Sequence, residues 1–216
     1  MAPTRLVVLI SGSGSNLQAI IDACKSSYIN GEIAAVVSNK ASAYGLIRAQ
    51  QAGITTEVLD HKQFASREDY DVALGQLIER FTPDLVVLAG FMRILTPYLV
   101  QKFKGKMLNI HPSLLPKYQG LNTHQRAIDA NDAEHGASVH FVTEELDGGP
   151  VVCQAKVAIL PGDTAESLAQ RVHKQEHILY PLVVKWFSEQ RLTMEAEYAV
   201  FDNKTLPVQG APYIKE

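Results

Sequence analysis

The sequence predicts an α/β protein with a Rossmann-like, doubly wound and mostly parallel sheet that ends in antiparallel strands. Short runs of Val, Ile and Leu alternate with helical patterns along the first half, and runs without polar alternation are typical of strands covered on both faces. Later, two strand-like runs are separated only by "TEELDGGP", which is too short for the crossover helix between parallel neighbours. We therefore expect that last pair to be antiparallel.

The first half of the chain supplies the parallel part of this sheet. Ser66 stands before "REDYDVALGQLIERF", where it can cap a helix, and Asp69 lies at the capping-box position. The predicted elements are strands 6–10, 33–37, 55–59, 85–88 and 107–110, with helices at 15–25, at 45–52 and after Ser66. This alternation predicts helical crossovers between parallel strands.

The second half starts with the antiparallel pair, predicted at residues 137–142 and 151–157. Asp163 is expected to open a long helix, "DTAESLAQRVHKQEHILYPLVVKWFSEQ", with Glu166 at the capping position, and Pro181 is expected to kink or divide it. The segment "RLTMEAEYAVFDNKTLPVQG" predicts a hairpin that turns at "DNK", followed by a loose tail.

The composition favours a cytoplasmic protein whose main partner is neither nucleic acid nor a membrane. The chain has 216 residues, 46% of them hydrophobic, and a net charge of −3, which argues against nucleic acid or an anionic membrane as the main partner. No apolar run approaches the roughly 20 residues that cross a bilayer, and the N-terminus lacks signal-peptide organisation. Cys24 and Cys153 are too few for a disulfide framework or a four-cysteine metal site.

The stretch "LVVLISGSGSNLQAII" reads as strand, glycine-serine loop and helix. In an open parallel sheet this turn lies at the carboxyl ends of the strands, where ligands bind. Gly12 and Gly14 let the backbone approach a ligand, and the amides around Gly14, Ser15 and Asn16 form a helix start that favours an anion. The third glycine and the acidic residue of a dinucleotide fingerprint are missing. A monophosphate site is therefore favoured, although a tight turn alone would also need glycines.

The stretch "MLNIHPSLLPKYQG" joins a predicted strand to two prolines, which impose a rigid and irregular path. Asn109 and His111 are two residues apart, so their side chains share one face of the strand. An amide donor beside a titratable ring suits a carbonyl that becomes an oxyanion, with the ring supplying the proton. Asp147, in the turn "ELDGGP", is the candidate carboxylate that stabilises the protonated ring. A packed histidine and an ordinary turn would also fit these residues.

Two motifs taken together, "NIHPSLLPKYQG" and "GASVHFVTEELDGGPV", resemble the folate-dependent formyltransferase family. The N-terminal "LISGSGSNLQAII" looks like the branch that acts on 5′-phosphoribosylglycinamide, and the resemblance weakens after about Arg191. It implies the formyltransferase fold and transfer of a formyl group from the co-substrate 10-formyltetrahydrofolate to the amine of that acceptor, without a metal. It also implies an enzyme of purine synthesis.

The resemblance assigns roles by position. His111 would be the general acid, Asn109 would hold the oxyanion, and Asp147 would keep His111 protonated and order a water. Gly14, Ser15 and Asn16 would bind the substrate phosphate, and Glu176 and His173 would bind the rest of the acceptor. The residues implied for the folate are Arg67, Met92, Arg93, Ile94, Leu95, Asn109, Thr143, Glu144 and Asp147.

Glu176 also stands out by its position in the predicted long helix. The apolar residues there form an inward stripe, and Glu176 falls on that stripe. A carboxylate facing a core needs a partner, which a substrate with amine or hydroxyl donors would supply, but a position at a solvent edge fits the pattern equally well. One departure from the family pattern lies after "LLPKY", where this chain has Gln119 and Asn122 and retains His124.

We expect one domain over residues 1–216, as a monomer or homodimer. Its phosphate-binding half would be about 1–100, its catalytic and folate-binding part about 85–190, and its C-terminal hairpin and tail about 191–216. Within the same family, a methionyl-tRNA formyltransferase or a formyltetrahydrofolate hydrolase is the main alternative. "HKQEH", residues 173–177, fits a zinc-peptidase signature but leaves Asn109, His111 and Asp147 unexplained. A non-enzymatic phosphate sensor is the remaining alternative.

Overall fold

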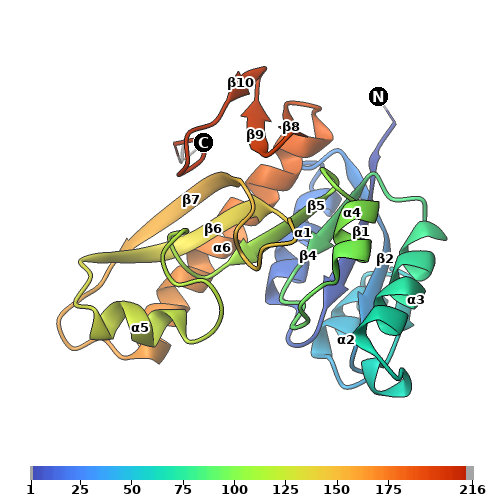
Figure 1. The fold of residues 1–216 in the computed structure, drawn as a ribbon, viewed down its shortest axis with the longest axis horizontal. Coiled ribbons are helices and arrows are strands. Elements are labelled where there is room, and N and C mark those ends of the chain that lie inside the picture. The colour runs from blue at the N-terminus through green and yellow to red at the C-terminus, as the bar shows by residue number, and fades with distance from the viewer. Residues whose placement is uncertain (1, 213–216) are drawn as a thin grey trace. The chain divides into compact units, whose positions relative to one another are not determined.

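The computed structural model describes residues 2–212, which fall into two compact units (Figure 1). We call Met1–Asn109 the N-terminal unit and Ile110–Glu216 the C-terminal unit. Strand β5 (Met107–His111) carries the chain from the first into the second. The predicted single domain with its three parts stays a prediction.

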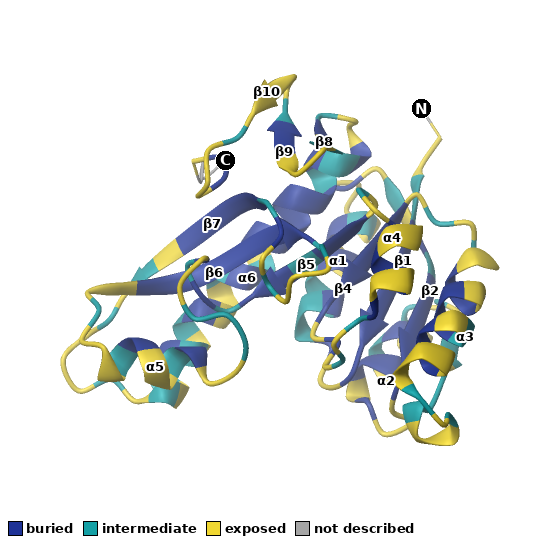
Figure 2. Cartoon of the chain, in the orientation of Figure 1, coloured by how far each residue is buried: buried dark blue, intermediate teal, exposed yellow. Residues whose placement is uncertain are grey.

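The N-terminal unit contains the parallel strands that the alternating pattern predicts. They are β1 (Thr4–Ile10), β2 (Gly31–Ser38), β3 (Thr56–Val58), β4 (Leu85–Leu88) and β5, in the hydrogen-bonded order β3-β2-β1-β4-β5. Every neighbouring pair in this order is parallel. The side chains of β1 from Leu6 to Ile10 are fully buried, which explains the unbroken apolar run (Figure 2).

The helices of this unit are α1 (Ser15–Lys25), α2 (Tyr44–Gln51), α3 (Arg67–Glu79) and α4 (Pro97–Lys102), with a 3₁₀ turn at His61–Gln63. The predicted cap of α3 is confirmed, because Ser66 Oγ accepts a hydrogen bond from the Asp69 amide at 3.0 Å. Asp69 Oδ2 accepts from the same hydroxyl at 2.7 Å. Helix α4 has only 6 residues and escaped prediction, because so short a segment shows no helical period.

The C-terminal unit contains α5 (Thr123–Asp129), β6 (Glu134–Phe141), β7 (Val151–Ala158) and α6 (Ala165–Ser188). Strands β6 and β7 are antiparallel as predicted, and they follow β5 in the strand order of the seven-stranded sheet. Helix α6 packs against both strands, and α5 contacts α6 and β6. The predicted fold class, a mostly parallel sheet with antiparallel strands at its C-terminal end, is confirmed.

Helix α6 differs from the prediction at its start and at its proline. Thr164, not Asp163, is the N-cap, and its side chain and that of Ser167 exchange hydrogen bonds with each other's amides at 3.1 and 3.0 Å. The prediction of Glu166 as the capping partner is therefore wrong by one residue, since Asp163 instead accepts a hydrogen bond from Arg171 Nη1 at 2.9 Å. Pro181 lies inside one continuous helix, so a division there is also wrong. Residues 179–184, around Pro181, are all buried. The packing of these residues offsets the cost of a proline inside a helix, which is about 3 kcal/mol.

The chain ends in a small antiparallel sheet of β8 (Leu192–Glu195), β9 (Tyr198–Phe201) and β10 (Lys204–Thr205). The predicted turn at "DNK" is confirmed, with Asp202 and Asn203 at φ 49° and 61° between β9 and β10. The third strand, β8, was not predicted as a separate element. The last residues of the predicted tail, 213–216, lie outside the described residues. No helix among residues 2–212 has the length and apolarity that a membrane span requires.

Candidate active site

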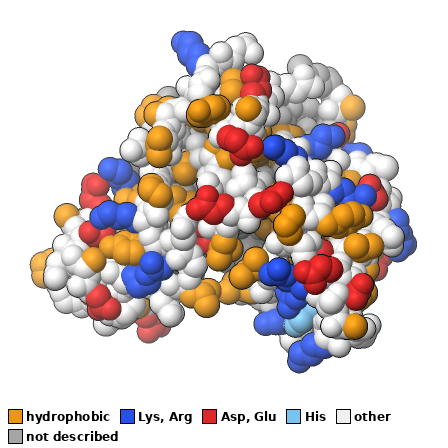
Figure 3. Space-filling model, in the orientation of Figure 1, with side chains coloured by type: hydrophobic (Ala, Val, Ile, Leu, Met, Phe, Trp, Pro, Cys, Tyr) orange, Lys and Arg blue, Asp and Glu red, His pale blue; other side chains and the backbone are white. Residues whose placement is uncertain are grey.

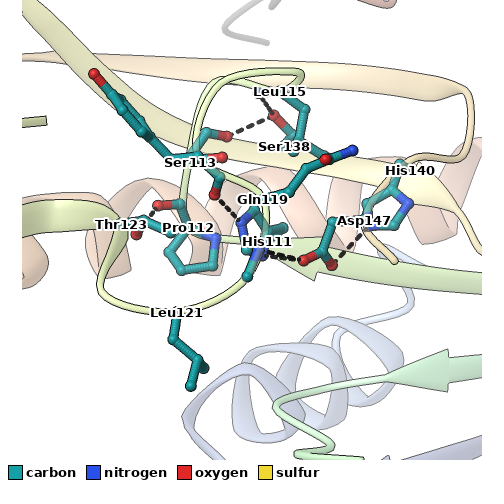
Figure 4. A network of polar contacts seen from close by, with 12 residues as sticks. His111, Pro112, Ser113, Leu115, Gln119, Leu121, Thr123, Ser138, His140 and Asp147 are labelled. Carbon is teal, nitrogen blue, oxygen red and sulfur yellow. Dashed lines mark hydrogen bonds and ion pairs between the residues drawn. The ribbon is translucent and has the colours of Figure 1, made fainter. Parts of the chain in front are cut away.

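His111 is the last residue of β5, and oxygen atoms face both of its ring nitrogens (Figure 4). Its Nε2 lies 2.8 Å from the carbonyl oxygen of Tyr118, and its Nδ1 lies 3.4 Å from Asp147 Oδ2. A carbonyl and a carboxylate only accept hydrogen bonds, and a neutral imidazole has one N–H. A ring nitrogen must therefore carry a hydrogen to donate to either oxygen, and the side chain is oriented by one contact on each of its two nitrogens.

Asp147 is presented by the turn between β6 and β7. Its backbone is in the left-handed region, at φ 51°, and its Oδ2 also accepts a hydrogen bond from the Gly120 amide at 3.0 Å. The turn needs a glycine at position 149, where an added Cβ would stand 1.9 Å from the carbonyl oxygen of Phe141. The "DGG" of the sequence thus has a structural reason, and the side chain that this turn presents points at His111.

His140 is a second histidine beside Asp147, and sequence reasoning missed it. Its Nδ1 lies 2.8 Å from the Phe141 carbonyl oxygen and therefore donates to it, and its Nε2 lies 3.9 Å from Asp147 Oδ1. Burial lowers the pKa of His140 and favours the neutral ring. The available signal was Ser138 and His140, two polar residues at alternate positions of the otherwise apolar "GASVHF".

The proline segment after His111 is anchored by side chains from β6 and β7. The hydroxyl of Ser138 accepts a hydrogen bond from the Leu115 amide at 3.1 Å and donates to the Ser113 carbonyl at 2.6 Å. The amide of Gln154 donates to the Leu115 carbonyl at 2.8 Å and to the Ser138 hydroxyl at 2.9 Å. The two prolines prevent a helix or a sheet in this segment. These side-chain hydrogen bonds therefore take the place of backbone ones and hold the segment that follows His111.

In the N-terminal unit, the glycine-serine loop leads directly into α1. Gly14 has φ 71°, and an added Cβ would stand 2.5 Å from the Cα of Gly45, so only glycine fits there. The Gly45 amide donates to the Gly12 carbonyl at 3.0 Å, and Arg48 Nε donates to the Ser13 carbonyl at 2.8 Å. Amides in the first turn of a helix have no acceptor within the helix, which makes this loop a suitable anion site. Ser15 and Asn16 begin that turn.

The segment after β4 combines exposed apolar side chains with anchored ends. Met92 and Ile94 are 64% and 53% exposed, which is unusual for such side chains and suits an apolar ligand. The Met92 amide donates to Ser11 Oγ at 2.8 Å, and the Thr96 amide donates to the buried Asp71 Oδ2 at 2.6 Å. One side chain directly after β1 and one on α3 thus fix this irregular segment at both ends.

Arg67 and Arg93 both lie close to Asp71. Burial raises the pKa of the Asp71 carboxyl, while the hydrogen bond from the Thr96 amide and these two positive charges oppose that rise. The guanidinium of Arg93 stands 5.3 Å from the centre of the Tyr70 ring. The two arginines that the resemblance assigned to the folate thus lie near the same carboxylate.

The remaining candidate residues are distributed over several elements. Asn109 is half-buried on β5, and in the loop after β6 Thr143 is half-buried and Glu144 is exposed. Glu176 is buried together with the stripe residues on both sides of it, so of the two positions that the sequence left open the structure shows the one that faces the core. His173 is exposed on α6. Among residues 2–212, no three His, Cys, Asp or Glu side chains group closely enough to hold a metal ion, including those around "HKQEH".

Charged side chains of both signs are mixed over the face of the molecule drawn in Figure 3. Lys and Arg alternate there with Asp and Glu, and no broad basic field covers this face. Such a face is not the kind of surface that attracts a nucleic-acid backbone.

Comparison with protein families matches residues 4–184 to the formyl transferase family. Among curated proteins, the chain is 58% identical over 205 residues to "Phosphoribosylglycinamide formyltransferase" of Escherichia coli, covering 95% of this chain and 97% of that protein. It is also 46% identical over 181 residues to the human "Trifunctional purine biosynthetic protein adenosine-3", covering 84% of this chain and 18% of that protein.

Solved structures give the same result. The phosphoribosylglycinamide formyltransferase of Coxiella burnetii is 51% identical, covers 98% of this chain and 100% of its own, and has a TM-score of 0.94. The glycinamide ribonucleotide transformylase 1 of Symbiobacterium toebii is 42% identical, with a TM-score of 0.90 over 93% of this chain and 94% of its own.

Proposed function

This chain belongs to the formyl transferase family, and from that premise we propose that it formylates the amine of 5′-phosphoribosylglycinamide in purine biosynthesis. Relatives that carry the name of this enzyme match the chain over nearly its whole length. The observation that carries the chemistry is the contact between His111 at the end of β5 and Asp147 in the turn between β6 and β7. The alternatives are disfavoured, because these relatives are named neither for tRNA, nor for hydrolysis of a formylfolate, nor for peptidase activity.

The family uses a folate-type formyl donor, and we propose 10-formyltetrahydrofolate. The acceptor amine attacks the formyl carbon, the carbonyl oxygen becomes an alkoxide, and the bond from that carbon to the folate nitrogen then breaks. The amine loses one proton and the folate nitrogen gains one, so the exchange balances without an oxidant or a metal. Asn109 would hold the alkoxide through its amide, as in other sites where fixed donors meet a developing oxyanion.

The contacts of His111 indicate which ring nitrogen moves a proton. Nε2 is held by the Tyr118 carbonyl at 2.8 Å, whereas Nδ1 lies 3.4 Å from Asp147. A charge-assisted hydrogen bond is usually about 2.7–2.9 Å long, so a proton on Nδ1 would be only weakly hydrogen-bonded to the carboxylate. We propose that Nδ1 is the proton donor and that Asp147 stabilises the protonated ring and orders a water beside it.

The binding residues follow the same assignment. Gly14, Ser15 and Asn16 would bind the substrate phosphate, and Glu176 and His173 would contact the rest of the acceptor. The residues proposed for the folate are Arg67, Met92, Arg93, Ile94, Leu95, Asn109, Thr143, Glu144 and Asp147. Two exposed apolar side chains among them and the arginines near Asp71 support an aromatic ligand with a carboxylate tail. We further propose a cytoplasmic monomer or homodimer whose partners are these small molecules.

An absorbance assay for release of tetrahydrofolate tests this function. Purified protein with 10-formyltetrahydrofolate is offered phosphoribosylglycinamide, initiator tRNA or water alone as the acceptor. We expect turnover only with phosphoribosylglycinamide. Equal turnover with tRNA or with water would replace the proposal by one of the related activities, and saturable binding without turnover would favour a sensor.

A further inference from the structure

A row of polar groups crosses the carboxyl ends of three neighbouring strands in the N-terminal unit. Ser11 directly follows β1, Asn39 directly follows β2, and Met92 lies in the segment after β4. In the sheet, β2, β1 and β4 lie side by side in that order. Ligands of open parallel sheets bind outside this edge, so groups placed here can act on a bound substrate.

Two hydrogen bonds join this row, and their directions follow from the groups involved. The Met92 amide can only donate, so the Ser11 hydroxyl oxygen, 2.8 Å away, accepts from it. The single hydrogen of that hydroxyl is donated to Asn39 Oδ1 at 2.6 Å. Ser11 and Asn39 are only 5% and 1% exposed, so little water competes for these bonds. Asn39 therefore orients the hydroxyl that holds Met92.

The bond to Ser11 holds the middle of an otherwise unanchored segment. Within residues 2–212, it is the only hydrogen bond that a backbone amide from Gly90 to Leu95 donates. These residues form neither helix nor strand. Before them the Ala89 amide donates to a carbonyl of β1, and after them the Thr96 amide donates to Asp71. Between these two ends, the position of the backbone depends on Ser11.

The position of this segment matters for the binding of a ligand. Residues 92–95 are proposed to bind the folate, and Met92 and Ile94 expose their apolar side chains. A ligand that binds to a loosely held loop must order the loop at the same time, and the lost conformational freedom lowers its affinity. A hydrogen bond that orders the loop beforehand therefore raises the affinity for the folate without touching it.

We propose that Ser11 is a positioning residue for the formyl donor. Through its hydrogen bond to the Met92 amide, and with its hydroxyl oriented by Asn39, it holds residues 92–95 in the conformation that binds the folate. This inference rests on the proposed function for the identity of the donor. It concerns the affinity for the donor and not the transfer step, because Ser11 acts on the segment and not on a reacting atom.

Amide hydrogen exchange at Met92, followed by NMR, tests the positioning itself. Ser11→Ala removes the acceptor, and we expect the Met92 amide to exchange about threefold to tenfold faster, the value of one hydrogen bond. Asn39→Asp keeps an oxygen that accepts from Ser11 and should retain the slow exchange of the wild type. Equal exchange in the wild type and in Ser11→Ala would overturn the proposal.

Binding of tetrahydrofolate, measured by titration calorimetry, tests the effect on affinity without any turnover. We expect Ser11→Ala to raise the Kd about threefold to tenfold. In steady-state kinetics the KM for 10-formyltetrahydrofolate should rise by the same factor, while kcat and the acceptor KM stay unchanged. Ser188→Ala also removes a buried hydroxyl, and as the control it should leave all of these values unchanged.

The possible outcomes separate this inference from the proposed function. An unchanged Kd in Ser11→Ala would overturn the inference, and so would an equal rise in the acceptor KM, which would place the effect in the adjoining glycine loop. If Ser11→Ala fails to fold, Asn39→Ala keeps the serine but not its orientation and should raise the same Kd. Wild-type protein that binds tetrahydrofolate without formylating the acceptor would refute the proposed function alone, whereas protein that does not bind it would refute both.

Discussion

The C-terminal unit satisfies the polar groups that it buries around its proline segment, whereas the N-terminal unit buries several that have no partner. Ser113, Leu115, Ser138 and Gln154 form the first set, linked by hydrogen bonds of 2.6–3.1 Å. In the second set, the buried atoms without a hydrogen-bond partner among the described residues are Tyr70 Oη, Asp71 Oδ1, Arg93 Nε and Thr96 Oγ1.

The two regions should therefore differ in rigidity and in their contribution to the free energy of unfolding. A buried polar network whose members are all satisfied holds one geometry, and here it holds the segment that begins at His111. A buried polar atom without a partner costs about 1–3 kcal/mol. We therefore expect the segment that begins at His111 to be rigid, and we expect the unsatisfied atoms in the cluster beside the exposed Met92 and Ile94 to lower the stability of their unit.

The largest effect is expected at the centre of the satisfied region. His111→Ala removes the proposed acid and should lower kcat by about 10²–10⁴-fold, the range for losing a positioned acid. His61→Ala, in the N-terminal unit and outside the proposed site, is the matched control and should keep kcat. Steady-state rates at saturating substrates, with circular dichroism to verify folding, measure both. A His111→Ala variant within tenfold of wild type would remove this residue from the chemistry.

The next largest effect is expected from the carboxylate. Asp147→Asn keeps the shape of the side chain but loses the charge that stabilises the protonated His111, and kcat should fall about 10–10²-fold. The pH dependence of kcat should change as well, because the substitution removes a negative charge that lies 3.4 Å from the ring. Rates measured across the pH range test both points, and full turnover with an unaltered pH profile would show that Asp147 has no tuning role.

The anchoring of the proline segment is tested by stability. Ser138→Ala leaves the Leu115 amide and the Ser113 carbonyl without their partner and should lower the free energy of unfolding by about 1–3 kcal/mol. Ser188 is also buried, but within residues 2–212 its hydroxyl bonds only to the Lys185 carbonyl of its own helix. Ser188→Ala should therefore cost less than about 1 kcal/mol. Urea unfolding measures the free energy of unfolding of both variants. Equal losses would mean that the hydrogen-bond network around Ser138 gives no more stability than a single hydrogen bond within a helix.

The smallest effect is expected in the unsatisfied cluster. Tyr70→Phe removes a buried hydroxyl that has no partner, so the free energy of unfolding should stay the same or rise by up to about 1 kcal/mol. In contrast, Tyr118 donates to Asp132 Oδ2 at 2.7 Å, and Tyr118→Phe should be destabilising. Urea unfolding again provides the measurement. A clear loss of stability in Tyr70→Phe would show that this hydroxyl is satisfied and would remove the contrast between the two regions.

Much of the fold could be predicted because its signals are local. The apolar runs of β1, β2 and β4 and the cap at Ser66 depend on neighbours a few residues away. Short elements such as α4 are too short to show a helical period. The N-cap of α6 lies one residue later than predicted, because Asp163 accepts a hydrogen bond from Arg171 instead of capping the helix. Pro181 stayed within its helix because tertiary packing outweighs local propensity.

The sequence by itself determined the order of the longer strands and helices, the glycine turn before α1, and His111 and Asp147 as candidates. Only the tertiary structure decided that His140 stands beside Asp147, that Ser138 and Gln154 anchor a segment 25 and 39 residues away, and that His135 meets His124. The physical reason is the distance along the chain over which each kind of interaction acts. Periodicity and capping act within a few residues, whereas these hydrogen bonds depend on which strands lie side by side and in which register.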